Sequence, residues 1–124
     1  MLEVRRVSLE IFRAMLGHAR NESALIADMT STPEQMPETA TYYVSADGRS
    51  GFGVAHNGEL IGVFSLERGR GEALVSHAVA NGARRLDCFD GYLPKLYARH
   101  GFWEVARVAN WTPGEPDVVF MERL

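Results

Sequence analysis

The sequence has very little cysteine, no cluster of residues with metal-ligand spacing and no disulfide framework. Cys88 is the only cysteine among 124 residues, so the chain can form neither an intrachain disulfide nor a cysteine-based metal cluster. The four histidines show no metal-ligand spacing, and we predict no metal site. A lone cysteine is typical of a reducing compartment, so we expect a cytoplasmic protein.

Long apolar runs and a basic excess are also missing. No segment approaches 18 consecutive apolar residues, and the N-terminus lacks the apolar core of a signal peptide, so we expect no membrane partner. The formal net charge is −3 at pH 7, which argues against a nucleic-acid partner. With 46% hydrophobic residues, the composition indicates a single domain that spans residues 1–124.

The first third of the chain predicts a strand, a helix and a broken polar segment. Leu2–Val7 has the pattern of a short strand, and Ser8 can cap the helix that follows. From Asn21 to Ala40 the chain is polar and contains two prolines, so a helix starting in the capping-box sequence Thr32–Gln35 must be short or kinked. This segment is either a surface connector or a substrate-facing flap. The apolar positions of the first helix share one face; they are Ile11, Phe12, Met15, Leu16 and Ala19.

Three strands follow in quick succession. We place them at Thr41–Ala46, Gly51–His56 and Glu59–Leu66, separated by the dipeptides Asp47-Gly48 and Asn57-Gly58. Glycine and asparagine tolerate positive φ, so these dipeptides favour tight hairpin turns. The sequence therefore predicts an antiparallel meander in the middle of the chain.

The rest of the chain alternates between helices and strands. Because the next helix joins the strands Glu59–Leu66 and Arg85–Phe89, those two strands should run parallel. The predicted fold class is α/β (α+β), with a mixed, mostly antiparallel sheet, one parallel βαβ crossover and flanking helices. The elements after the meander are Gly71–Ala83 (helix), Arg85–Phe89 (strand), Leu93–His100 (helix), Phe102–Asn110 (strand) and Asp117–Leu124 (strand).

The glycine-rich segment Arg68–Ala73 lies between a predicted strand and a predicted helix. The first N–H groups of a helix have no intrahelical partner, and the helix dipole adds partial positive charge there. Glycines let phosphates approach the backbone closely. The segment is not a P-loop, and Leu74 stands where a dinucleotide-binding loop needs its third glycine. The sequence therefore predicts a phosphate-bearing cofactor of another kind.

Two motifs in this half of the chain resemble those of the GNAT superfamily of N-acetyltransferases. Arg68, Gly71 and Ala73 match the pattern Arg/Gln-x-x-Gly-x-Gly/Ala, and Leu96–Phe102 is similar to Leu-Tyr-x-x-x-Gly-Phe. The resemblance covers Thr41–Leu124 well. It implies an N-acetyltransferase that transfers the acetyl group of acetyl-CoA to a primary amine acceptor of unknown identity. The alternative is a catalytically silent GNAT-like domain that binds acyl-CoA or a protein partner.

The resemblance also implies which residues hold acetyl-CoA. Its pyrophosphate would lie on the amides of the glycine-rich loop, and its pantetheine arm would pair with the edge of strand Glu59–Leu66. Asp90 stands where the family often has asparagine; an aspartate can cap a helix but cannot donate an amide N–H. The implied cofactor-binding residues are Val63, Phe64, Ser65, Arg68, Gly69, Arg70, Gly71, Glu72, Ala73, Asp90 and Tyr97.

The catalytic candidates are Tyr97, Glu59 and His56. The resemblance implies that Tyr97 is the general acid that protonates the departing sulfur, and the alternative is a tyrosine that only packs its helix on the sheet. Glu59 and His56 lie near the cofactor strand and could remove the proton of the amine. Both could equally be solvated turn residues, so the sequence leaves the general base open.

The last strand raises the question of a homodimer. Asp117–Leu124 carries Val118, Phe120 and Met121, which is more apolar surface on both faces than an exposed edge strand usually presents. We expect one face to cover the sheet. The other face meets either the chain's own helices or a second subunit.

Overall fold

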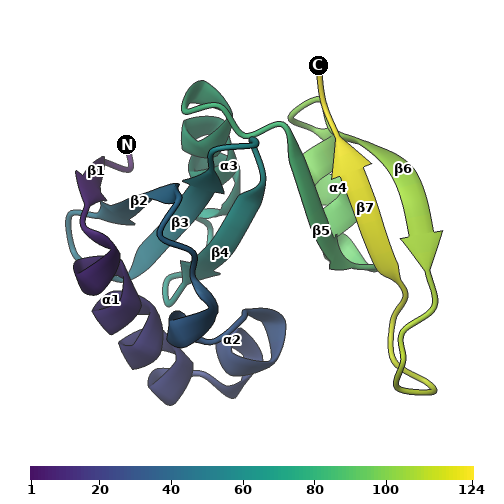
Figure 1. The fold of residues 1–124 in the computed structure, drawn as a ribbon, viewed down its shortest axis with the longest axis horizontal. Coiled ribbons are helices and arrows are strands. Elements are labelled where there is room, and N and C mark those ends of the chain that lie inside the picture. Colours follow the sequence, from purple (N-terminus) through teal and green to yellow (C-terminus); the bar gives the residue numbers. More distant parts are fainter. The chain divides into compact units, whose positions relative to one another are not determined.

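The strands of the computed structural model, which describes all 124 residues, form two antiparallel sheets (Figure 1). One sheet belongs to a compact unit of residues Met1–Ala83, and the other belongs to a second unit, Arg84–Leu124. The mixed α/β class with mostly antiparallel strands is confirmed. The parallel ladder that we expected across the crossover is not formed, because β4 (Leu60–Ser65) and β5 (Arg85–Phe89) belong to different sheets and β5 pairs with β7 instead.

The four-stranded sheet of the first unit has the order β1-β2-β3-β4, and every neighbouring pair is antiparallel. The meander predicted from the two hairpin dipeptides is therefore confirmed. The strands lie within one or two residues of their predicted bounds. Apart from β4 they are β1 (Val4–Val7), β2 (Ala40–Ser45) and β3 (Ser50–Ala55).

Helix α1 (Leu9–Glu22) begins as predicted, because the Ser8 hydroxyl accepts a hydrogen bond from the Ile11 N–H at 3.1 Å. The following segment differs from our expectation. It contains a helix that the sequence analysis missed, α2 (Ala24–Met29), capped by the Ser23 hydroxyl. The expected short helix is a single 3-10 turn, Pro33–Gln35.

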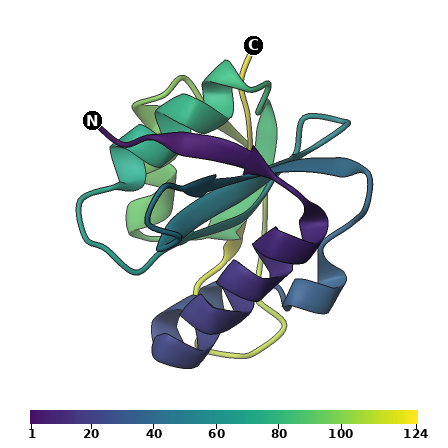
Figure 2. The same cartoon turned by 90° about the vertical axis from the view of Figure 1, so that its left-hand side faces the viewer.

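The core of the first unit lies between α1 and one face of the sheet (Figure 2). The ring of Phe12 lies 4.6 Å from that of Tyr42 and 5.8 Å from that of Phe64, measured between centroids. Leu16 and Ala19 are also buried, whereas Ile11 is 49% exposed. The apolar face of α1 is therefore narrower than the sequence pattern indicated.

Helix α3 (Gly71–Ala80) packs on β3 and β4 and buries Leu74, Val75 and Ala78. Because it follows β4 directly, its N-terminus lies at the carboxyl end of that strand. The helix ends three residues earlier than predicted, and Gly82 takes a positive φ of 97° just beyond it. This is the role that glycine commonly has after a helix.

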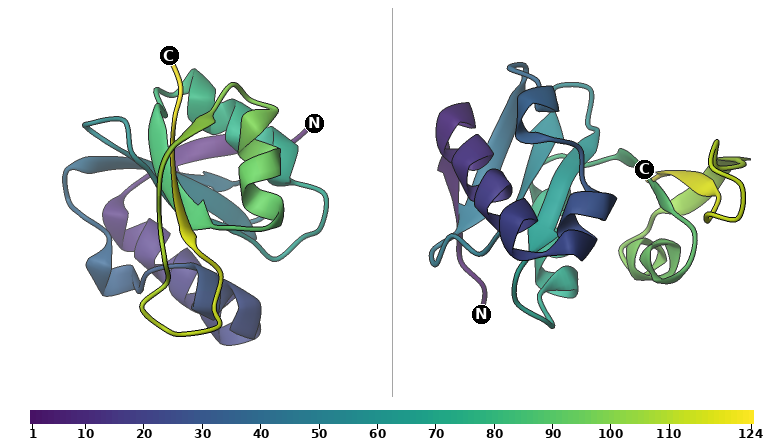
Figure 3. Two further views of the ribbon diagram at one scale, coloured as in Figure 1. Left: turned by 90° about the vertical axis from the view of Figure 1, so that its right-hand side faces the viewer. Right: turned by 90° about the horizontal axis from the view of Figure 1, so that it is seen from below.

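The second unit consists of the sheet β5-β7-β6 and one helix, α4 (Tyr92–Ala98), that contacts β5 and β6 (Figure 3). Its two outer strands are β5 and β6 (Trp103–Val108), and its central strand is β7 (Val118–Glu122). Because β7 has a partner on each side, it is not an edge strand, and Val118, Val119 and Met121 are buried. The apolar character of β7 therefore no longer argues for a second subunit, and the homodimer stays a prediction without that support.

The longest helix of the chain, α1, has 14 residues. None of the helices combines the length and hydropathy that a membrane crossing requires.

Candidate functional site

A bulge interrupts β4 in its middle. Ile61 pairs with Gly53 and Phe64 pairs with Gly51, so β4 has one residue more than β3 between the same two rungs. Ile61 and Phe64 both pack in the α1 core, although residues three apart in a regular strand would face opposite sides. The extra residue is accommodated by Gly62, whose φ is +60°. The bulge therefore turns the backbone at Gly62–Val63 out of the regular ladder.

The outer edge of β4 is open within its sheet. β4 is the last strand in the order β1-β2-β3-β4, and only β3 pairs with it. An edge strand presents a row of backbone N–H and C=O groups that a further extended chain can pair with. The predicted cofactor-binding residues Val63, Phe64 and Ser65 lie on this strand, with Val63 in the bulge and the other two directly after it.

The glycine-rich loop presents free backbone donors at the start of α3. The N–H groups of Gly69, Gly71 and Ala73 donate to no acceptor of the chain, and the first helical bond runs from the Leu74 N–H to the Arg70 carbonyl. Gly69 has a φ of +82°, and a Cβ there would meet no atom within 4 Å. Open space beside unpartnered amides at a helix N-terminus is the arrangement that binds phosphate groups.

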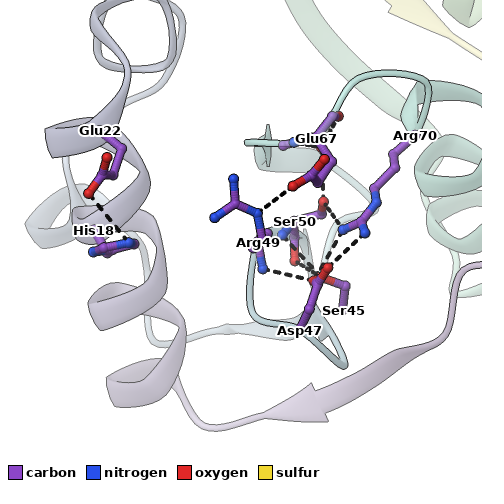
Figure 4. A network of polar contacts seen from close by, with 9 residues as sticks. His18, Glu22, Ser45, Asp47, Arg49, Ser50, Glu67 and Arg70 are labelled. Carbon is purple, nitrogen blue, oxygen red and sulfur yellow. Dashed lines mark hydrogen bonds and ion pairs between the residues drawn. The ribbon is translucent and has the colours of Figure 1, made fainter.

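The side chains of the loop do not all face the same way. Arg68 is exposed, and its side chain makes no hydrogen bond or ion pair within the chain. Figure 4 shows that the side chain of Arg70 instead points toward Asp47 in the β2–β3 turn. The sequence analysis treated both arginines as cofactor-binding residues. It missed Asp47, because the dipeptide Asp47-Gly48 was interpreted only as a turn.

Asp90 does not cap α4 through its side chain, although an aspartate is able to cap a helix. The N-cap residue is Gly91, and no side chain caps this helix. The Asp90 carboxylate accepts from the Gly91 N–H at 3.0 Å and from the Arg107 guanidinium at 2.8 Å. Both hydrogen bonds lower the pKa of Asp90, and the bond from Arg107 has the larger effect. Its ion pair belongs to a cluster in which Arg107 also contacts Glu104 and Asp117.

Tyr97 lies in α4 and is 5% exposed. Its ring meets the ring of Phe102 edge-on, with the centroids 5.8 Å apart. Burial raises the pKa of the phenol, and the nearby Cys88 and Asp87 raise it further, so the hydroxyl stays protonated at neutral pH. That hydroxyl makes no hydrogen bond within the chain. Since no fully buried polar side-chain atom lacks a partner, the oxygen reaches solvent.

The two candidates for the general base lie at the other end of β4, in the β3–β4 turn. The Glu59 N–H donates to the Asn57 side chain at 3.0 Å, and the His56 N–H donates to the Thr39 carbonyl at 3.1 Å. The carboxylate of Glu59 and the imidazole of His56 make no hydrogen bond within the chain. His56 also lines an open cavity of about 330 Å³ with residues of β2, β3 and the end of α3.

Solved structures identify the fold. The chain is similar to a GNAT superfamily phosphinothricin acetyltransferase from Sinorhizobium meliloti, solved in complex with acetyl-CoA. The TM-score is 0.66 at 16% identity, over 98% of this chain and 87% of that chain. This chain has the GNAT fold.

Two further N-acyltransferases of this fold are similar over nearly their whole length. An acyl-CoA N-acyltransferase from Pseudomonas aeruginosa matches with a TM-score of 0.71 at 17% identity, over 100% of this chain and 99% of that chain. A spermidine N-acetyltransferase chimera from Vibrio cholerae and hSSAT matches with a TM-score of 0.66 at 15% identity, over 99% and 95%. No protein-family model matches the chain, and no curated protein matches its sequence.

Proposed function

We propose that this chain is an acetyl-CoA-dependent N-acetyltransferase that acts on a primary amine. One observation supports this most strongly. An open strand edge with a bulge leads directly into a glycine loop whose amides at Gly69, Gly71 and Ala73 have no partner in the chain. An amide-rich arm that ends in a pyrophosphate fits this sequence of donors, because extended amides pair with strand edges and phosphates bind helix N-termini.

The residues present fit coenzyme A. The backbone of Val63–Ser65 would hold the pantetheine arm, and the loop amides from Gly69 to Ala73, including those of Arg70 and Glu72, would surround the pyrophosphate. The exposed guanidinium of Arg68 adds a mobile positive charge beside those phosphates. We leave Asp90 out of this set, because its carboxylate is held by Arg107.

Acetyl-CoA would supply a thioester whose carbonyl carbon a neutral amine attacks while the C–S bond breaks. We assign the general acid to Tyr97, since its phenol carries a proton at neutral pH and its oxygen reaches solvent. That proton would go to the departing sulfur. Glu59 or His56 would take the proton of the attacking amine, directly or through water. We place the reaction in the cytoplasm, where a free thiol such as Cys88 stays reduced.

Calorimetry with coenzyme A tests the cofactor assignment. We expect the parent chain to bind coenzyme A and acetyl-CoA, and we expect Gly71→Asp to abolish binding, because it places a negative charge against the phosphates. If the parent chain bound neither coenzyme A nor acetyl-CoA, the cofactor assignment would be wrong.

Turnover separates an enzyme from a silent acyl-CoA-binding domain. A panel of primary amines that includes spermidine and phosphinothricin should contain an acceptor, and release of free thiol measures the rate. With that acceptor, Tyr97→Phe should keep the cofactor affinity and lower kcat by about 10²–10⁴-fold. Coenzyme A binding without turnover of any amine would favour the silent domain.

A further inference from the structure

The two arginines on either side of Gly69 have different surroundings. Arg70 forms a two-pronged ion pair with Asp47, in which one guanidinium nitrogen lies 2.7 Å from Oδ2 and the other lies 3.1 Å from Oδ1. Arg68 has no partner in the chain. When two nitrogens of a guanidinium bind the two oxygens of one carboxylate, the pair fixes the orientation of the arginine side chain as well as its distance. The side chain of Arg70 is therefore held by an ion pair within the protein, whereas the side chain of Arg68 has no such bond.

Asp47 is itself held on several sides. Besides Arg70, its Oδ1 accepts from the Ser45 hydroxyl at 2.6 Å and from the Arg49 N–H at 3.0 Å. These donors, with Arg70 the largest contributor, hold the pKa of Asp47 far below its usual range. The carboxylate is thus a fixed anchor in the β2–β3 turn, and the loop before α3 is attached to it through Arg70.

A second path joins the same turn to the loop through hydroxyl groups. Arg70 donates to the Ser50 hydroxyl at 3.0 Å, and Ser50 is fully buried at 0% exposure. The Ser50 and Ser65 oxygens lie 2.9 Å apart. The Ser65 hydroxyl lies 2.6 Å from the Glu67 carbonyl and accepts from the Glu67 N–H at 3.1 Å. Figure 4 shows Asp47, Ser50 and Arg70 converging from the β2–β3 turn, the start of β3 and the loop.

A glycine-rich loop without such attachments would lose conformational entropy each time it bound a ligand. Holding it in the binding conformation beforehand removes that cost and improves affinity. We propose that Arg70 is a positioning residue that acts through Asp47 to hold the loop amides ready for phosphates. The inference rests on the proposed function only for the identity of the ligand.

The experiment measures loop order and cofactor affinity separately. Backbone ¹⁵N relaxation of the ligand-free protein reports order parameters for Gly69–Ala73, which are about 0.85 for rigid backbone and below about 0.6 for flexible backbone. Asp47→Asn and Arg70→Gln should each lower these values and weaken coenzyme A binding about tenfold. The double variant should be no worse than either single variant, because both remove the same pair.

Two further variants serve as controls. Arg49→Gln removes the exposed pair that joins the same turn to Glu67, ahead of the loop amides, and keeps the Arg49 N–H bond to Asp47, so it should change order and affinity much less than Arg70→Gln does. Arg70→Lys keeps the charge without the fork and should restore only part of the loop order. If Arg70→Gln weakened binding while Asp47→Asn did not, Arg70 would be a direct phosphate ligand and the proposal would be wrong. If the parent bound no coenzyme A, the order parameters would still decide the positioning role.

Discussion

The two ends of β4 differ in how firmly their side chains are held. At the carboxyl end, Ser65 belongs to a hydrogen-bonded network that includes Ser50, Arg70 and Asp47. At the amino end, the side chains of Glu59 and His56 make no hydrogen bond within the chain. The bulge at Gly62 lies between these two environments.

This difference corresponds to two tasks in the proposed reaction, cofactor binding at the carboxyl end of β4 and proton transfer at its amino end. A phosphate-bearing cofactor is the same in every turnover, so a loop ordered in advance binds it best. A group that transfers a proton must instead reach the reacting atom, and such hydrogen bonds are often made only when substrate is present. The comparison suggests that β4 is rigid where it would hold the cofactor and adaptable where it would meet the acceptor.

The largest effect that we expect is a loss of activity in variants at the amino end of β4. Glu59→Gln and His56→Ala each remove one candidate base, and the variant that removes the true base should lower kcat by about 10²–10⁴-fold. An amine with a pKa near 10 is mostly charged at neutral pH, so kcat/KM of the parent should rise with pH, and this variant should flatten or shift the rise. Rates measured from pH 6 to pH 10 test this.

Both variants should unfold at the parent's urea concentration, since neither side chain makes a hydrogen bond in the chain. Two parent-like pH profiles would show that neither residue is the base. A large loss of stability would contradict the comparison itself.

Gly62→Ala tests the bulge that separates the two ends. An alanine Cβ would lie 3.1 Å from the Met36 sulfur and 3.1 Å from the Phe12 ring, in a backbone with φ +60°. The left-handed conformation costs about 1–2 kcal/mol and overpacking about 1–3 kcal/mol. We therefore expect the free energy of unfolding to fall by about 2–5 kcal/mol in urea titrations.

The matched control is Gly114→Ala, where φ is +86° and no atom lies within 4 Å of the added Cβ. Only the conformational cost applies there, so the loss should be about 1–2 kcal/mol. Equal losses in the two variants would mean that the core around Gly62 absorbs the extra methyl group.

The sequence predicted most of the elements and the glycine-rich loop before α3 because both depend on local patterns. Strand β5 matched its predicted bounds, and the hairpin dipeptides placed the meander correctly, since turn residues act over only a few positions. Helix α2 was missed because its six residues are too few for a clear period. The side-chain pair of Asp47 and Arg70 joins residues 23 positions apart, and the division of the strands into two sheets is likewise set by long-range packing. No local sequence pattern predicts the Asp47–Arg70 pair or the division into two sheets.

Acid should weaken the ion pair between Asp47 and Arg70 near the carboxyl end of β4. The folded pKa of Asp47 is lowered, so its contribution to stability is fully present above the unfolded value near 4 and is lost as the pH falls below it. Such a partly exposed pair contributes about 0.5–1 kcal/mol. In urea titrations, the parent should therefore exceed Asp47→Asn by about this amount at pH 6, and the difference should shrink between pH 4 and pH 2. A difference that stayed constant across this range would exclude ionisation of Asp47 as its source.

The smallest effect that we expect distinguishes Arg68 from the anchored arginine beside it. Because Arg68 is exposed and unpaired, its charge would act on bound phosphates mainly through screened attraction, so Arg68→Gln should weaken coenzyme A binding about threefold in dilute buffer. The loss should vanish near 1 M salt, where the Debye length is about 3 Å. Arg70→Gln should keep most of its larger loss at that salt concentration, since it acts through loop order. Calorimetric titrations of both variants at low and high salt measure the contrast, and parallel salt dependence would show that the two arginines bind the ligand in the same way.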